Sequence, residues 1–137
     1  MGSWARPLVL ASFSACSFFI GCTWTVFSNI PDVSAKLFPP LADPNLLAWT
    51  LNANNLSQFL SAPFALWLLA RPVGTGLRST MLCAMAATLL QSVLWAVATF
   101  DSTASWVTAA LILGGMAGGS ASAFTQGCVS HLSAAWY

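Results

Sequence analysis

The side chains of this chain that could recognise another molecule are mostly neutral amides and aromatic rings. Four amides fall close together within one apolar stretch, at Asn52, Asn54, Asn55 and Gln58. If a helix begins at Pro44, they lie roughly 12–21 Å along it. Asn55 and Gln58 are three residues apart, so their side chains share a helix face, as do those of Asn54 and Gln58. The amides either hydrogen-bond to neighbouring helices or line a polar path for a solute, and both interpretations remain open.

A second candidate is the segment Trp24-Thr25-Val26-Phe27-Ser28. A tryptophan ring that faces a cavity can hold an organic cation over its face. Trp24 lies roughly 9 Å beyond the middle of its apolar stretch, so, taken alone, it is better interpreted as part of the aromatic belt at a membrane surface. Gln91 stands alone in another apolar stretch, and we interpret it as a packing residue.

The sequence offers no arrangement of residues for acid–base, nucleophilic or metal chemistry. No acidic or basic side chain lies inside the apolar stretches, and the one histidine, His131, belongs to no Ser-His-Asp, Cys-His or HExxH arrangement. The four cysteines are dispersed without CxxC spacing, which is typical of small packing residues. We therefore expect no enzymatic activity, no metal site and no cofactor. A net charge of +1 gives no reason to expect a nucleic-acid partner.

The elements that must position these residues follow from the distribution of charge. The chain is 58% hydrophobic and 5% charged, whereas soluble domains are about 25% charged. Its four Lys or Arg and three Asp residues separate stretches that are long enough to cross a bilayer, which takes about 20 residues. Backbone groups in hydrocarbon must be satisfied within the segment, so the stretches should be helical. We predict an all-α, multi-pass integral membrane protein with four transmembrane helices, at about 7–29, 44–70, 79–100 and 105–130.

The signs of the charges predict which membrane face is which. Arg6, Arg71 and Arg78 fall at the N-terminus and in the loop between the second and third helices. Lys and Arg in short loops mark the cytoplasmic side, so both termini should be cytoplasmic. The sequence does not distinguish the plasma membrane from an organelle membrane. The opposite side carries Asp32, Lys36, Asp43 and Asp101.

Prolines and glycines predict the connections. Pro31 should end the first helix, and the loop from Pro31 to Asp43 should be extended. Asp43 can cap the second helix with Pro44 in its first position, and Pro63 should kink that helix. The segment 71–78 contains two glycines and a proline, so we expect a short turn-forming loop there.

The last apolar stretch carries two overlapping GxxxG motifs, formed by Gly114, Gly115, Gly118 and Gly119. Glycine at this spacing allows helices to approach closely, so we expect these residues to form a packing face. Glycine in two registers also suits a helix that slides against its neighbours.

Three motifs in these segments resemble the N-terminal four helices of a major facilitator superfamily transporter, and most of all solute carrier family 49, the feline leukemia virus subgroup C receptor-related proteins. The first is Trp24-x-x-Phe27-Ser28, and the second is Pro63-Phe-Ala-Leu-Trp-Leu-Leu followed by Gly76-Leu-Arg78. The third is the segment 132–137, rich in small residues before Trp-Tyr. Together the motifs extend over most of the chain, although each is short.

The resemblance implies a partial major facilitator fold, in which residues 1–137 are the N-terminal portion of a twelve-helix transporter that works by alternating access. Members of the family are associated with choline, ethanolamine, haem and vitamin-like metabolites. The implied partners are therefore the bilayer, a small-molecule solute and the transporter helices that this chain lacks.

The resemblance also implies roles for particular residues. Arg71, Gly76 and Arg78 would form a cytoplasmic gating loop, although Ala70 or Arg71 stands where the family has its acidic residue. Choline-type members carry a glutamine in the fourth helix at the position of Ser122, and Gln126 lies one turn later. The substrate-binding candidates are Trp24, Phe27, Ser28, Asn55, Gln58, Ser122 and Gln126.

An alternative interpretation is a complete four-helix membrane protein with a structural or assembly role, held together by its GxxxG face. The sequence does not give the substrate, the coupling ion, the direction of transport or the oligomeric state.

Overall fold

The computed structural model describes the backbone of residues 5–136 and the side chains of residues 7–8, 10–15, 17–22, 30–72 and 75–129. The described backbone is helical apart from short connections and contains no strand, as the composition predicts. Its helices are α1 (Ala5–Asn29), α2 (Pro31–Leu37), the 3-10 helix η1 (Pro39–Ala42), α3 (Pro44–Leu69), α4 (Val73–Ala98) and α5 (Trp106–Trp136).

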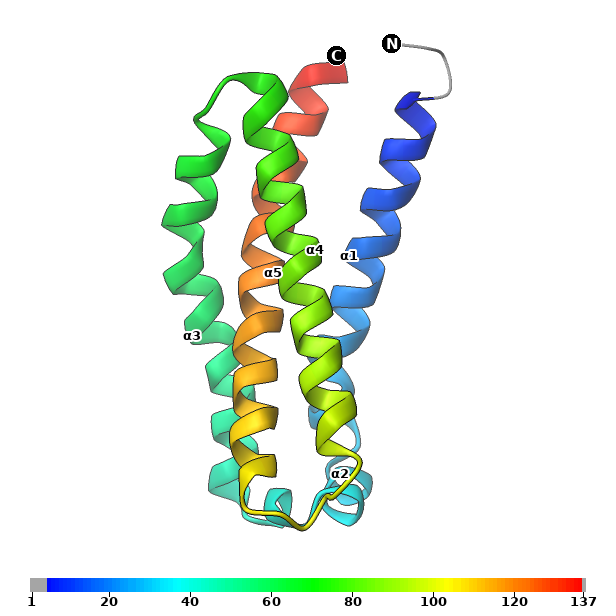
Figure 1. Ribbon diagram of the computed structural model, residues 1–137, viewed down its shortest axis with the longest axis vertical. Helices are drawn as coiled ribbons and strands as arrows, with labels where there is room; N and C mark the ends of the chain where they lie inside the picture. Colours follow the sequence, from blue (N-terminus) through cyan, green and yellow to red (C-terminus); the bar gives the residue numbers. More distant parts are fainter. Residues whose placement is uncertain (1–4, 137) are drawn as a thin grey trace.

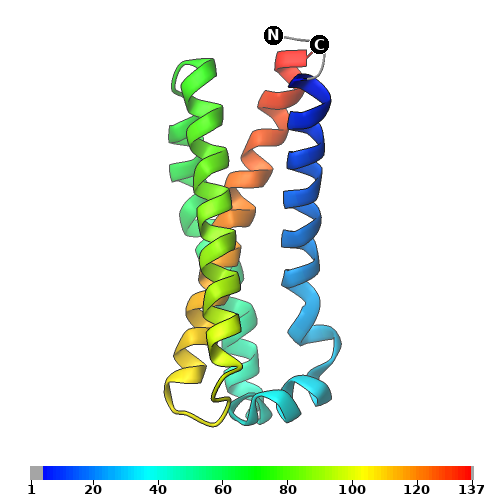
Figure 2. The ribbon, with the colours of Figure 1, turned by 45° about the vertical axis from the view of Figure 1, so that its right-hand side comes forward.

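The four long helices form an up-and-down bundle in which α5 is central (Figure 1). The closest packing is between α5 and α3 and between α5 and α4, whereas α3 and α4 make few contacts with each other. Figure 2 shows α1 on the other side of α5 from α4. The beginning of α1 and the end of α5 lie at the same end of the bundle as the α3–α4 connection. Helix α2 lies at the opposite end, with the α4–α5 connection.

Two of the described helices are long and apolar enough to cross a membrane. The segments concerned are Thr75–Ala98 in α4 and Trp106–Val129 in α5. They differ in burial, because 67% of the most apolar stretch of α5 is buried and only 17% of that of α4. Helix α5 is therefore a core helix, whereas α4 presents an apolar surface outward. Helix α3 is as long as α4, but it carries several amide and hydroxyl side chains and is less apolar than the other two.

The loop predicted to be extended between Pro31 and Asp43 is helical instead. Pro31 occupies the first turn of α2, where a missing N–H costs nothing, and Asp32 in the first turn and Lys36 in the last suit the helix dipole. Burial holds the segment against the bundle, since Phe38 and Leu41 pack into a core cluster with residues of α4 and α5.

The loop predicted at 71–78 is also mostly helical, because α4 begins at Val73 rather than near Ser79. The N–H groups of Thr75 and Gly76 both donate to the Pro72 carbonyl, which builds the first turn. A Cβ at Gly76 would lie only 2.7 Å from the Leu68 carbonyl oxygen. The glycine that suggested a loop therefore serves the close approach of α4 to the end of α3. At the other boundaries, α4 ends at Ala98 and α5 runs from Trp106 to Trp136, beyond the predicted residue 130.

The predicted start of the second long helix is confirmed. Asp43 is the N-cap of α3, and its side chain accepts a hydrogen bond of 2.8 Å from the Asn45 N–H. Pro44 stands in the first turn, where a proline is well tolerated. The helix continues through Pro63 to Leu69.

The two GxxxG registers of α5 face two different helices. A side chain at Gly119 would collide with the Asn54 carbonyl of α3, and one at Gly115 would lie 3.0 Å from the Thr50 carbonyl. On the α4 side, a side chain at Gly114 would collide with the Trp95 ring, and one at Gly118 would meet the Gln91 amide. In the structure α5 thus presents one glycine stripe to each of its two neighbours.

Candidate functional site

Serine hydroxyls join α3 to α5 in the middle of the bundle. The Ser57 hydroxyl donates to the Met116 carbonyl at 2.6 Å and also lies 3.0 Å from the Asn54 carbonyl. One turn later, the Ser61 hydroxyl donates to the Ser120 oxygen at 2.8 Å. The glycines of α5 bring the two helices close enough for these short side chains to reach across.

A cluster of two amides and a hydroxyl lies beside this contact. The Gln58 Nε2 donates to the Gln126 Oε1 at 3.1 Å, and the Gln126 Nε2 donates to the Ser122 Oγ at 3.1 Å. We call Gln58, Ser122 and Gln126 the amide cluster. The structure thus brings together three of the residues proposed from the sequence, although Gln58 and Gln126 are 68 residues apart.

The amide cluster borders a cavity of about 170 Å³. Small side chains leave this space open, including Ala62 and Ala65 of α3 and Ala123 and Gly127 of α5. The side-chain oxygen Oε1 of Gln58 accepts no hydrogen bond from the described residues, so it is available to a ligand. The cluster offers neutral donors and acceptors and no charge, and it can therefore orient a polar group but cannot transfer a proton near neutral pH.

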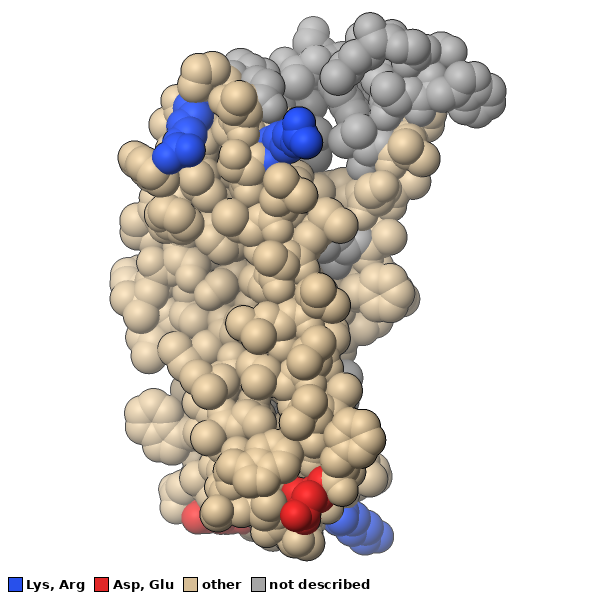
Figure 3. Space-filling view, in the orientation of Figure 1, with Lys and Arg blue, Asp and Glu red and all other residues tan. Residues whose placement is uncertain are grey.

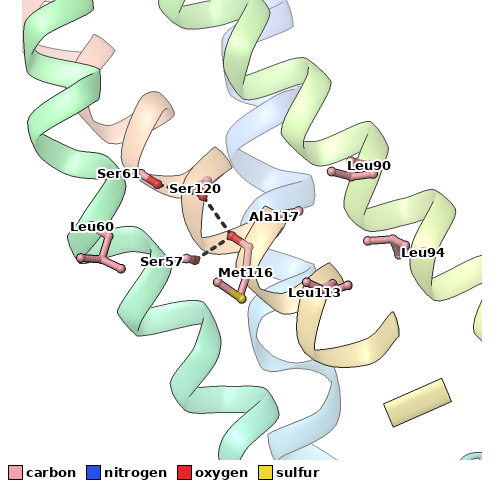
Figure 4. A pocket seen from close by; sticks show the side chains of 9 residues that line it. All are labelled: Ser57, Leu60, Ser61, Leu90, Leu94, Leu113, Met116, Ala117 and Ser120. Atoms are coloured by element: carbon pink, nitrogen blue, oxygen red, sulfur yellow. Dashed lines mark hydrogen bonds between the residues drawn. The ribbon is translucent and has the colours of Figure 1, made fainter. Parts of the chain in front are cut away.

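A larger groove of about 480 Å³ opens between α3 and α4, with α5 as its floor (Figure 4). Leucines form its walls, and Ser57, Ser61 and Ser120 lie along one side. These hydroxyls already bond to each other or to the Met116 carbonyl, so the groove presents an apolar surface. It shares no lining residue with the cavity at the amide cluster, because Gln58 projects from α3 about 100° away from Ser57.

The remaining amides of α3 take separate positions. Asn54 is buried, and its backbone carbonyl faces Gly119. Asn55 and Asn52 are exposed and make no hydrogen bond through their side chains to the described residues. The face shared by Asn55 and Gln58 in the sequence pattern is therefore divided, with Gln58 at the α5 contact and Asn55 outside it.

Trp24, Phe27 and Ser28 belong to the last two turns of α1, but their side chains lie outside the described residues. Earlier in α1, Phe13 packs against the core pair Leu69 and Cys128. Helix α1 therefore lies against the bundle near the end where α3 and α4 connect.

The residues proposed as a gating loop form a basic end of the bundle. The Arg71 guanidinium lies over the Trp67 ring, 4.2 Å from its centroid, and Phe64 stacks on the same ring at 5.4 Å. Arg78 is exposed in the second turn of α4. The three Asp residues of the chain belong to the opposite end, so among the described residues no Asp side chain lies beside either arginine (Figure 3).

The three serines of the α3–α5 contact were not among the residues proposed from the sequence. Their signal was available, because Ser57 and Ser61 are four residues apart and so share a helix face. Gln91 is fully buried, as a packing residue should be, but neither atom of its amide has a hydrogen-bond partner among the described residues.

Comparison with known proteins finds no matching family model, no significantly similar curated protein and no significantly similar solved structure. The likeness to solute carrier family 49 therefore rests on the short motifs described above, and the functional argument rests on the geometry of this chain.

Proposed function

We propose that this chain supplies four transmembrane helices, α1, α3, α4 and α5, to a solute transporter of the major facilitator type. In this proposal α5 and α3 border the solute path, and the amide cluster contacts the solute. The chain acts by alternating access together with further helices, and it performs no chemistry on its substrate.

The observation that carries the proposal is the inverted distribution of polar and apolar side chains. Large apolar residues point outward along the middle of the bundle, and Phe59 and Leu89, for example, are 77% and 66% exposed. Polar residues such as Gln91, Thr80 and Ser57 are buried. A monomeric soluble protein rarely exposes so much apolar surface, whereas a bilayer requires it.

The solute contact is argued from the amide cluster. Polar side chains inside a membrane bundle usually either hydrogen-bond to other helices or contact a solute that crosses the membrane. The amide cluster is suited to both roles, since it bridges α3 and α5 by a hydrogen bond and leaves a hydrogen-bond acceptor at an open cavity. The family likeness suggests a small organic cation such as choline, haem or a vitamin-like metabolite. For a cation, Trp24 would supply the aromatic face and the amide cluster would bind polar groups of the solute.

A structural or assembly role is the second candidate, and the glycine stripes favour it. Gly115 and Gly119 on one side and Gly114 and Gly118 on the other fasten α5 between two neighbours. A bundle packed in this way can serve a structural or assembly role without any conformational change. The two proposals differ in whether the amide cluster binds a solute.

Membrane placement can be tested with single cysteines at opposite ends of the bundle. Thr75 is exposed in the first turn of α4, and Thr103 is exposed in the α4–α5 connection. In a variant without native cysteines, an impermeant thiol reagent applied to intact cells should label Thr103→Cys and not Thr75→Cys. Equal labelling of the two cysteine variants in sealed cells would contradict the proposal that α4 crosses the membrane.

Transport can be tested by comparing this chain with the longer protein that the proposal requires. Proteoliposomes that contain the twelve-helix protein should accumulate a labelled solute, and those with this chain alone should not. Gln126→Ala should raise the KM for uptake about tenfold, as expected for the loss of roughly 1.4 kcal/mol of binding. The matched variant Ser92→Ala, at an exposed hydroxyl on α4, should leave the KM unchanged. Uptake that is indifferent to Gln126→Ala would favour the structural role.

A further inference from the structure

We propose that the basic end of the bundle, formed by Trp67, Arg71 and Arg78, is a docking surface for the headgroup of an anionic phospholipid. This inference rests on the membrane placement proposed above, but not on transport. It assigns a partner to side chains that take no part in the proposed solute contact at the amide cluster.

Charge is the first argument for this partner. Arg71 and Arg78 are both exposed, and neither forms an ion pair with a described residue. All Asp residues of the chain belong to α2, to the start of α3 or to the α4–α5 connection, at the other end. No Asp side chain therefore compensates the two arginines, and a phosphate group is the complement that a membrane surface provides.

The apolar surroundings are the second argument, and they favour a lipid over a soluble phosphate. Arg71 lies over the Trp67 ring, which is 54% exposed, and Phe64, stacked on that ring, is 49% exposed. An arginine held over a ring at the edge of an apolar helix surface sits where a headgroup meets its acyl chains. A soluble anion would gain nothing from the exposed rings, whereas a phospholipid can cover them.

The connection between the helices is the third argument, because it fixes the two arginines on one end. A Cβ at Gly76 would be 2.7 Å from the Leu68 carbonyl and 3.0 Å from the Arg71 carbonyl. The start of α4 thus lies close against the end of α3, so Arg71 and Arg78 belong to the same end of the bundle. Figure 3 shows the basic groups of this end on one face of the molecule.

The proposal is tested by native mass spectrometry of the full chain in neutral detergent. The protein is mixed with equal amounts of phosphatidylglycerol and phosphatidylcholine that carry identical acyl chains. We expect retention of phosphatidylglycerol over phosphatidylcholine, and a preference that falls about fivefold in Arg71→Gln and in Arg78→Gln, because each basic residue at a membrane surface contributes about that factor. Lys36→Gln removes the same charge at the other end and should leave the preference unchanged.

Two further measurements keep the proposal open to refutation if a variant folds poorly. For the unaltered chain, raising the salt concentration should reduce the preference, because exposed charges are screened. An excess of glycerol phosphate, which carries the same anion without acyl chains, should not displace the lipid. Equal retention of both lipids, an equal effect of Lys36→Gln, or displacement by glycerol phosphate would overturn the proposal. A chain that retains neither lipid and does not fractionate with membranes would instead refute the membrane placement itself.

Discussion

At the scale of single residues, the glycines of α5 make the sharpest prediction. Gly119→Ala should lower the free energy of unfolding by about 1–3 kcal/mol, because the new methyl group would collide with the Asn54 backbone carbonyl, which cannot rotate away. Gly118→Ala should cost less, since it meets the movable end of the Gln91 side chain. The measurement is thermal or denaturant unfolding of the chain in detergent. The control is Gly21→Ala, at a helical glycine with nothing within 4 Å, which should be neutral or slightly stabilising.

The buried amide of Gln91 leads to a prediction of the opposite sign. Gln91→Met keeps the length of the side chain and removes two polar atoms that have no partner among the described residues. It should therefore raise the melting temperature in detergent, by the equivalent of about 1–3 kcal/mol. The matched change Gln126→Met removes the hydrogen bonds to Gln58 and Ser122 and should not stabilise. A loss of stability in Gln91→Met would mean that this amide has a partner in the membrane.

At the scale of elements, the pairing of α3 with α5 can be tested by a disulfide. The hydroxyl oxygens of Ser61 and Ser120 are 2.8 Å apart, so cysteines at these positions should form a disulfide upon mild oxidation. The experiment uses a variant without native cysteines whose chain is cleaved within α4. A disulfide then keeps the two fragments together, which is detected as a shift in gel mobility. Ser61→Cys paired with Ser92→Cys is the control, because Ser92 is exposed and bonds within its own helix. Equal crosslinking of both pairs would argue against the α3–α5 contact.

The elements also show what the sequence could predict and what it could not. The start of α3 was predictable, because Asp43 and Pro44 act on their own turn through a local hydrogen bond and a fixed backbone angle. The start of α4 was not, because Gly76 is there for its contact with the end of α3, and a glycine that serves packing looks the same in a sequence as one that serves a turn. The extended loop predicted after Pro31 was wrong for a related reason, since a proline that ends one helix can begin the next.

The site followed the same division. The polar positions within each apolar segment can be read from the sequence, and Gln58, Ser122 and Gln126 were all proposed in this way. Which amide meets which depends on how far α5 slides along α3, and the glycine stripe sets that register through contacts between helices. Asn55 was proposed with Gln58 but is exposed, because the pattern gives a shared face and not the position of the neighbouring helix.

At the scale of the whole molecule, the outward apolar surface distinguishes a membrane bundle from a soluble one. Leu89→Lys places a charge on the exposed face near the middle of α4 and should cost about 2.5–3.5 kcal/mol of insertion energy in a bilayer. Phe100→Lys adds the same charge at the end of the bundle, where the side chain is 87% exposed, and should be tolerated. Membrane insertion measured by glycosylation mapping should fall for the first variant and not for the second. Improved expression of Leu89→Lys in the aqueous fraction would indicate a soluble protein.

The central position of α5 has a consequence for the order in which the molecule is made. Helices α1, α3 and α4 leave the ribosome first, yet α3 and α4 make few contacts with each other and pack mainly on α5. Translation adds about 5–20 residues per second, so in the proposed membrane placement α3 and α4 remain for seconds without the helix against which they pack. Assembly of this bundle is therefore expected to be a late event that follows the synthesis of α5, and an interruption of synthesis before α5 would leave three long helices with few contacts between them.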